Sequence, residues 1–158
     1  MCKGRVVLNS ALMFAICFLT PLMGKGQELV KCKVQDKSLR SVKYRNAYSE
    51  RSTVDGRPSI LICISVKPED VNREFLVLLA HHLNQRFCRE ERLVVAILID
   101  YKAARYFNPN FQDVREAWRG EYFLDRRVGE EYVSFTTNLN YNDNPQARIR
   151  IDLGAGNE

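Results

Sequence analysis

Residues 59–66 read SILICISV and residues 93–99 read LVVAILI, and these two runs decide the fold. Each run is apolar at consecutive positions and rich in β-branched side chains, which is typical of a strand covered on both faces. Between them, the apolar residues of 75–87 recur at helical spacing and share one helix face. A strand, a helix and a second strand in this order predict a βαβ unit with parallel strands and a right-handed crossover.

The C-terminal third of the chain predicts antiparallel strands. Residues 120–124 and 131–137 flank a turn with a glycine near its end, which indicates a hairpin. Residues 147–153 alternate between apolar and charged side chains, as a strand with one wet face does. We therefore expect an α+β fold, a two-layer sandwich with a mixed sheet of about four to six strands and one long helix.

Two central strands that are apolar on both faces need a cover on each face. The aromatic-rich segment 101–118, with short helical pieces near 102–106 and 111–117, is one candidate for the second cover. A second copy of the chain, forming a homodimer, is the other.

The N-terminus has the features of an export signal. A basic start is followed by an apolar run that ends at Leu22 and by the small residues Gly24 and Gly26. We expect residues 1–26 to be a signal peptide, cleaved before Gln27, and the protein to be secreted or periplasmic. The alternative is an uncleaved N-terminal membrane anchor.

The net charge of +5 is unevenly distributed. Without residues 1–26, the chain has 21 basic and 19 acidic residues. Residues 31–51 hold seven bases and two acids, whereas residues 52–158 hold 14 bases and 16 acids. Because the excess lies in one N-terminal arm, nucleic acid is not an expected partner. The arm is a solvated linker in the simplest interpretation; contact with an anionic membrane surface is the alternative.

These observations divide the chain into four parts. Residues 1–26 are the signal, and residues 27–58 are a basic segment that is extended or loosely ordered, with a short strand expected at Leu29–Val34. Residues 59–153 are the α+β domain, and residues 154–158 are a flexible tail.

Three cysteines remain after removal of the signal. In an oxidising compartment they allow one disulfide, and we expect Cys32 to pair with Cys88, with all three reduced as the alternative. Cys63 lies in an apolar run and should be buried.

No motif in the chain predicts a metal, a cofactor or a catalytic residue. His81 and His82 are adjacent, so on a helix they point about 100° apart and cannot share a metal as residues four apart do. The chain has no Cys-x-x-Cys pair, no Gly-x-Ser-x-Gly elbow and no glycine-rich phosphate loop after the first strand.

Two groups of residues are candidates for binding. In open α/β sheets, ligands gather at the carboxyl ends of parallel strands. That position holds one group here: Lys67, Glu69, Asp100, Lys102 and Arg105. Asp100 is equally well placed to cap a helix. The second group would share the wet face of the antiparallel strands: Tyr132, Ser134, Thr136, Arg148 and Arg150.

The sequence favours a non-catalytic domain that binds a protein or an envelope component. The alternative is a small extracytoplasmic enzyme with Asp100 or Glu69 as proton carrier. These two functions can be distinguished by residues 101–118. In the enzyme this segment would close over a concave site, whereas in the binding domain it would pack as core.

Overall fold

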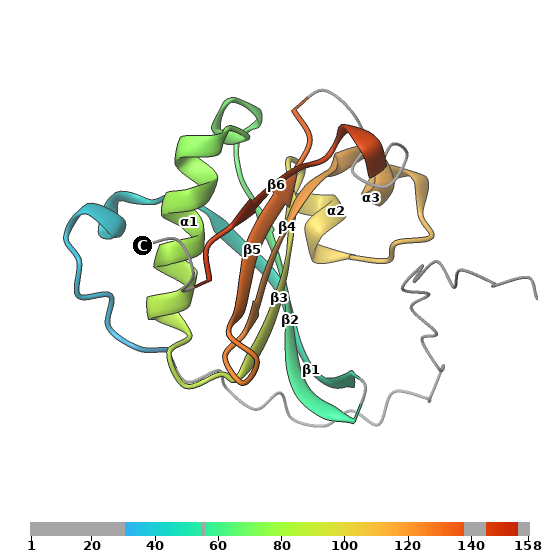
Figure 1. Ribbon diagram of the computed structural model, residues 1–158. Helices are drawn as coiled ribbons and strands as arrows, with labels where there is room; N and C mark the ends of the chain where they lie inside the picture. Colours follow the sequence, from blue (N-terminus) through green and yellow to red (C-terminus); the bar gives the residue numbers. More distant parts are fainter. Residues whose placement is uncertain (1–30, 55, 138–144, 155–158) are drawn as a thin grey trace, which may run out of the picture.

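The computed structural model describes residues 31–54, 56–137 and 145–154. Their six strands form one sheet in the order β1 to β6 (Figure 1). The strands are β1 (Arg45–Val54), β2 (Arg57–Ser65), β3 (Arg92–Leu98), β4 (Trp118–Asp125), β5 (Glu130–Phe135) and β6 (Ile149–Asp152). β2 and β3 are parallel, and every other neighbouring pair is antiparallel. The expected α+β fold with a mixed sheet is confirmed. The expected signal peptide and residues 155–158 of the expected tail lie outside the described residues.

In the described part of the chain, three α-helices accompany the sheet: α1 (Arg73–Arg86), α2 (Tyr101–Arg105) and α3 (Gln112–Ala117). Single 3₁₀ turns occur at Ser38–Ser41, Pro68–Asp70 and Pro145–Ala147. α1 begins at Asn72, whose side-chain oxygen accepts a hydrogen bond from the Phe75 amide at 2.9 Å. Within the described ranges, no helix has the length and apolar character needed to cross a membrane.

One face of the sheet is closed by α1. The side chains between α1 and the sheet form one apolar cluster, in which Leu76, Leu79 and Leu83 of α1 are fully buried. The sheet contributes every second residue of its strands: Ile60, Ile62 and Ile64 of β2, Leu93, Val95 and Ile97 of β3, Tyr122 and Leu124 of β4, and Val133 and Phe135 of β5. This alternation follows from the period of two in a strand.

The other face is covered by α2 and α3 over part of its area (Figure 1). The buried side chains of this contact are mostly small, which lets the short helices lie close to the strands. They are Cys63, Ala96, Leu98, Ala103, Ala104, Val114 and Ala117. The aromatic-rich segment is thus the second cover. It adds a partial third layer, so the expectation of two layers is corrected.

Residues 45–54 correct a second expectation, because they form β1 of the sheet and so belong to the domain that was expected to begin at residue 59. β1 is an edge strand that pairs with β2, with Glu50 opposite Leu61. Its side chains are polar on both faces and mostly exposed, so no apolar periodicity marks it in the sequence. Residues 31–34, part of the short strand expected at Leu29–Val34, are not in a strand.

Residues 31–44, here called the strap, cross the outer side of α1 (Figure 1). Cys32 and Cys88 form a disulfide, which is the pairing expected from the sequence, and Cys63 is free and buried. Val34 and Leu39 are buried. The Leu39 carbonyl accepts a hydrogen bond from Nδ1 of the buried His82 at 2.8 Å.

The hairpin expected from residues 120–137 is present as β4 and β5. Its turn ends at Gly129, whose φ of +70° lies in the left-handed region that glycine adopts without strain. The side chain of Asp125 accepts a hydrogen bond from the Arg127 amide at 3.1 Å. This turn sets the register that places Phe123 opposite Tyr132.

Candidate binding face

The strand register places six side chains in one line across the whole sheet, on the face that carries α2 and α3. This line, here called the open row, consists of Glu50, Leu61, Val94, Phe123, Tyr132 and Asp152, one from each strand. The four middle side chains are apolar or aromatic and only half-buried. In the neighbouring row, Cys63 and Ala96 are buried against the short helices. With strands spaced about 4.8 Å apart, the open row is about 24 Å long.

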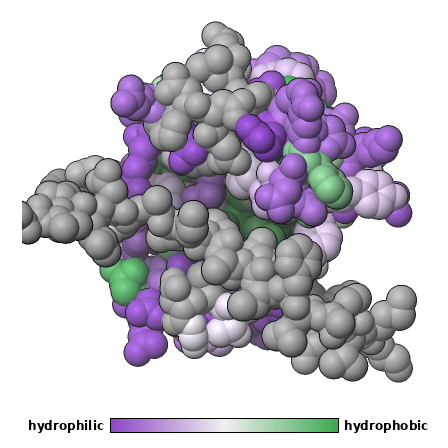
Figure 2. Space-filling view, turned by 90° about the vertical axis from the view of Figure 1, so that its right-hand side faces the viewer, coloured by the Kyte–Doolittle hydropathy of each residue, from purple (hydrophilic) through white to green (hydrophobic). Residues whose placement is uncertain are grey.

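Figure 2 faces this side of the molecule. Hydrophobic surface lies in its hollowed centre, between hydrophilic side chains. The half-buried apolar side chains of the open row lie on this face, beside the layer formed by α2 and α3.

Four planar groups from four strands stack side by side along one end of the open row. The rings of Phe123 and Tyr132 are 5.2 Å apart and nearly parallel, at 22°. The Arg92 guanidinium lies 5.4 Å from the Phe123 centroid, and the Arg150 guanidinium lies 3.8 Å from that of Tyr132. Stacked aromatic pairs and cation–π contacts each add stability beyond simple burial, so this end of the row is rigid.

Glu121 fixes the orientation of the Tyr132 ring. Its carboxylate accepts a hydrogen bond from the Tyr132 hydroxyl at 3.1 Å. Burial raises the pKa of Glu121, while the Tyr132 hydrogen bond and the charges of Arg148 and Arg150 act in the opposite direction. The sequence placed Tyr132, Arg148 and Arg150 on one face, and the structure brings Tyr132 and Arg150 into contact around this carboxylate.

Carboxylates balance the arginines at both edges of the stacked groups. Asp125, which is buried, lies 3.3 Å from Arg57 and 3.8 Å from Arg92. Arg150 is paired with Glu130 at 3.2 Å and with Asp152 at 2.8 Å. Because positive and negative groups alternate, the face favours an apolar ligand with a mixed polar rim over a strongly anionic one.

The residues predicted to form a site at the strand ends make separate contacts, unlike the stacked groups of the open row. Asp100 caps α2, since its carboxylate accepts a hydrogen bond from the Ala103 amide at 2.7 Å. Lys67 and Glu69 form a 3.6 Å ion pair in which both side chains are exposed. Lys102 and Arg105 are exposed on α2. A ligand-binding role for these residues remains a prediction.

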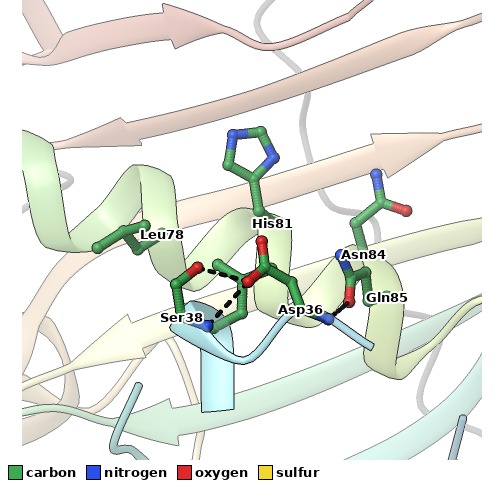
Figure 3. A pocket seen from close by; sticks show the side chains of 7 residues that line it. Asp36, Ser38, Leu78, His81, Asn84 and Gln85 are labelled. Carbon is green, nitrogen blue, oxygen red and sulfur yellow. Dashed lines mark hydrogen bonds between the residues drawn. The ribbon is translucent and has the colours of Figure 1, made fainter. Parts of the chain in front are cut away.

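Two open hollows lie elsewhere on the described surface. The larger, of about 480 Å³, lies between the strap and α1 (Figure 3). Some of its polar groups are hydrogen-bonded within the chain: the Asp36 carboxylate accepts two hydrogen bonds from Ser38, and the Gln85 side chain accepts one from the Gln35 amide. The smaller, of about 240 Å³, lies near Arg51 and Glu90. Among the described residues, no three His, Cys, Asp or Glu side chains are grouped as a metal site would require.

Sequence reasoning missed Arg92 and Phe123, which complete the stack. The hairpin itself carried the signal for Phe123, because a turn at residues 126–129 places Phe123 opposite Tyr132. Arg92 required knowledge that β3 lies beside β4. No protein-family model matches this chain, and neither the curated proteins nor the solved structures contain a significant match. The interpretation of the open row therefore depends on its own geometry.

Proposed function

We propose that this protein is a non-catalytic binding domain that holds an apolar segment of a partner protein on the open row. The observation that carries the proposal is the line of four half-buried apolar side chains. Leu61 packs against the cluster beneath α2 and α3, whereas Val94, Phe123 and Tyr132 lie outside that cluster. Single exposed apolar residues are ordinary, but a contiguous apolar stripe with a polar rim is typical of an interaction surface.

The shape of the open row supports a macromolecular partner. The row is long and crosses every strand, whereas small-molecule sites are concave and enclose most of their ligand. Arg92 and Arg150 stack against Phe123 and Tyr132 of the same chain, so contacts within the protein hold these side chains in place. Aromatic and arginine side chains that are ordered in this way are typical centres of binding energy in protein interfaces.

The enzyme alternative has less support. The Asp100 carboxylate is engaged as a helix cap, and Glu69 is exposed and paired with Lys67. The inward side chains of segment 101–118, such as Ala104 and Val114, belong to an apolar cluster. This packing is what the binding interpretation expects of the segment.

We also propose that the domain acts outside the cytosol, as a secreted or periplasmic protein. The Cys32–Cys88 disulfide supports this, because structural disulfides persist in oxidising compartments. The signal-like N-terminus is the second support. N-terminal sequencing of the exported protein is expected to begin at Gln27, and an intact Met1 in the membrane fraction would favour the anchored alternative. In this proposal, a βαβ scaffold supports the open row. The scaffold consists of β2, α1 and β3, and α1 is its one long helix.

The proposal is tested by selecting binders from a random dodecapeptide library on the purified protein. We expect the selected peptides to be rich in apolar residues and to bind Val94→Glu at least ten-fold more weakly than the wild type. Val128→Glu is the matched control, because Val128 is an exposed valine in the β4–β5 turn.

A selected peptide that binds both variants as tightly as the wild type would overturn the assignment of the open row. A selection that yields only acidic or basic peptides would also contradict it. The sequence also allows an envelope polymer as the partner. Competition between such a polymer and the peptide for the open row would indicate this alternative.

A further inference from the structure

The strap carries an excess of positive charge that the rest of the fold does not balance. Residues 31–44 contain five bases and one acid, whereas residues 45–158 contain sixteen bases and seventeen acids. Four of the five bases are lysines, and all four are exposed: Lys31, Lys33, Lys37 and Lys43. Among the described residues, no side-chain hydrogen bond or ion pair involves the ammonium groups of these lysines.

The strap divides its side chains between an inner and an outer side. Cys32 and Val34 face α1, so Lys31 and Lys33 lie on the other side of this extended segment. Val42 and Tyr44 pack against the main apolar cluster, and exposed Lys43 lies between them.

Arg40 is the exception among the strap bases. Its guanidinium donates hydrogen bonds to the carbonyls of Val34 at 3.1 Å and Gln35 at 3.3 Å, and so stabilises the bend of the strap. The lysines are therefore the bases that remain directed toward solvent.

The backbone beneath the lysines is held at several points. The disulfide joins Cys32 to Cys88, and the Cys32 amide donates to the Arg86 carbonyl at 2.8 Å. Further along, the Gln35 amide donates to the Gln85 side chain at 3.1 Å, and His82 holds the Leu39 carbonyl. Because the strap is ordered beforehand, a partner that binds the lysines pays little additional entropy.

We propose that the strap docks the protein on a bilayer surface that contains anionic phospholipids. Arginines outnumber lysines by sixteen to eight in the chain, yet the four outward positions are all lysine. Arginine forms bidentate hydrogen bonds with individual phosphate groups, whereas the lysine ammonium is a strongly hydrated point charge. Clusters of such charges are attracted to a diffuse anionic membrane surface at about 1 kcal/mol each.

A further observation favours a membrane over a soluble polyanion. Leu78, which is 42% exposed, lines the hollow beside the strap together with Ser38 and offers an apolar side chain to the interface (Figure 3).

The proposal does not depend on the open row, which lies on the opposite side of the sheet from α1. It is tested with the purified full chain and two kinds of vesicle: phosphatidylcholine alone, and phosphatidylcholine mixed with phosphatidylglycerol. The variant is Lys33→Gln, Lys37→Gln and Lys43→Gln. We expect it to bind the mixed vesicles roughly 100-fold more weakly than the wild type, while binding to neutral vesicles is unchanged.

The matched control removes the same charge from exposed positions outside the strap, by Arg73→Gln, Arg115→Gln and Arg127→Gln. We expect this control to lose several-fold less affinity for the mixed vesicles. Added salt should weaken wild-type binding, as it does for surface charges. Circular dichroism of each variant verifies that it is folded.

Three results would overturn the proposal. The first is equal binding of the wild type to both kinds of vesicle, and the second is an equal loss of affinity for the mixed vesicles in the control variant. The third is release of the protein from the mixed vesicles by inorganic polyphosphate that carries the same total charge as the lipid. The last result would assign the strap to a soluble polyanion. None of these results bears on peptide binding at the open row, so the two proposals fail separately.

Discussion

The two faces of the sheet differ in what lies over them, although the central strands β2 and β3 carry mostly apolar side chains on both faces. Val95 of β3 is fully buried beneath α1, and Val94, its neighbour in the chain, is half-buried on the open row. α1 has 14 residues and buries Leu76, Leu79 and Leu83 in the core cluster of its face, whereas α2 and α3 have only eleven residues between them. An apolar strand run therefore shows which residues need a cover but not whether the chain supplies one.

The largest expected effect comes from placing the same charge on each face. Val95→Glu would bury an unpaired carboxylate under α1, which we expect to cost more than about 4 kcal/mol and to prevent stable folding. Val94→Glu should cost less than about 1 kcal/mol, because its side chain reaches solvent. Guanidinium unfolding followed by circular dichroism measures both. Equal destabilisation would mean that the open row is packed like a core.

The strap adds a second layer to the closed side, and its disulfide should contribute the next largest effect. The bond joins residues separated by 56 positions, and a closed loop of this length stabilises the folded chain by about 4 kcal/mol in the chain-entropy account. We expect the double variant Cys32→Ser, Cys88→Ser to lose about that much stability in thermal or denaturant unfolding. Cys63→Ala is the control, since it removes the third thiol and leaves the disulfide in place. A double variant as stable as the wild type would show that the strap does not stabilise α1.

On the open side, the cap of α2 should have a moderate effect. Asp100→Ala removes the hydrogen bond to the Ala103 amide and should cost about 1 kcal/mol. Asp100→Ser keeps a capping oxygen and should recover most of that loss, as measured by the melting temperature. If Asp100→Ser were as unstable as Asp100→Ala, the carboxylate itself would matter, and Asp100 would return as a candidate ligand-binding residue.

The smallest expected effect is a pH dependence on the closed side. Burial lowers the pKa of His82, its hydrogen bond to Leu39 partly opposes this, and the charge of Arg86 lowers it further; Tyr44 packs against the ring. The folded protein therefore binds this proton less readily than the unfolded chain, so stability should fall as the pH drops below about 6.5. Above that pH the group contributes no pH dependence.

Two neighbouring histidines provide the test of this pH dependence. His82→Asn keeps a donor for the Leu39 carbonyl and should flatten the stability profile between pH 6.5 and the lower pKa of the folded state. His81→Asn, at an exposed position on the same helix, should leave the profile as it is in the wild type. A profile that flattens equally in both variants would contradict the assignment to His82.

The sequence predicted those parts of the fold in which burial follows a local period. The runs at 59–66 and 93–99 became β2 and β3, and the hairpin and the short helices were expected at nearly their observed positions. β1 was missed, because an edge strand with polar side chains on both faces carries no apolar pattern. The strap was missed for a related reason: its inward residues, such as Val34 and Leu39, are too widely spaced to show a period.

The sequence predicted only those residues of the candidate face that the alternation of side chains along a strand places together. The alternation at residues 148–153 placed Arg148 and Arg150 on one side of a strand, and Tyr132 could be added from the hairpin. The open row itself depends on the register of five strand pairs, and register is a tertiary property. Val94 shows the difference, because its sequence environment is the same as that of the buried Val95.

The central claim is that the half-covered face, through the open row, is the binding surface of this protein. The most direct measurement is a titration of the isotopically labelled protein with a selected peptide, followed by backbone amide shifts in nuclear magnetic resonance spectra. The account predicts the largest shifts at Leu61, Val94, Phe123 and Tyr132, with little change in α1 and the strap. Shifts concentrated in the hollow beside α1, with the open row unaffected, would contradict it.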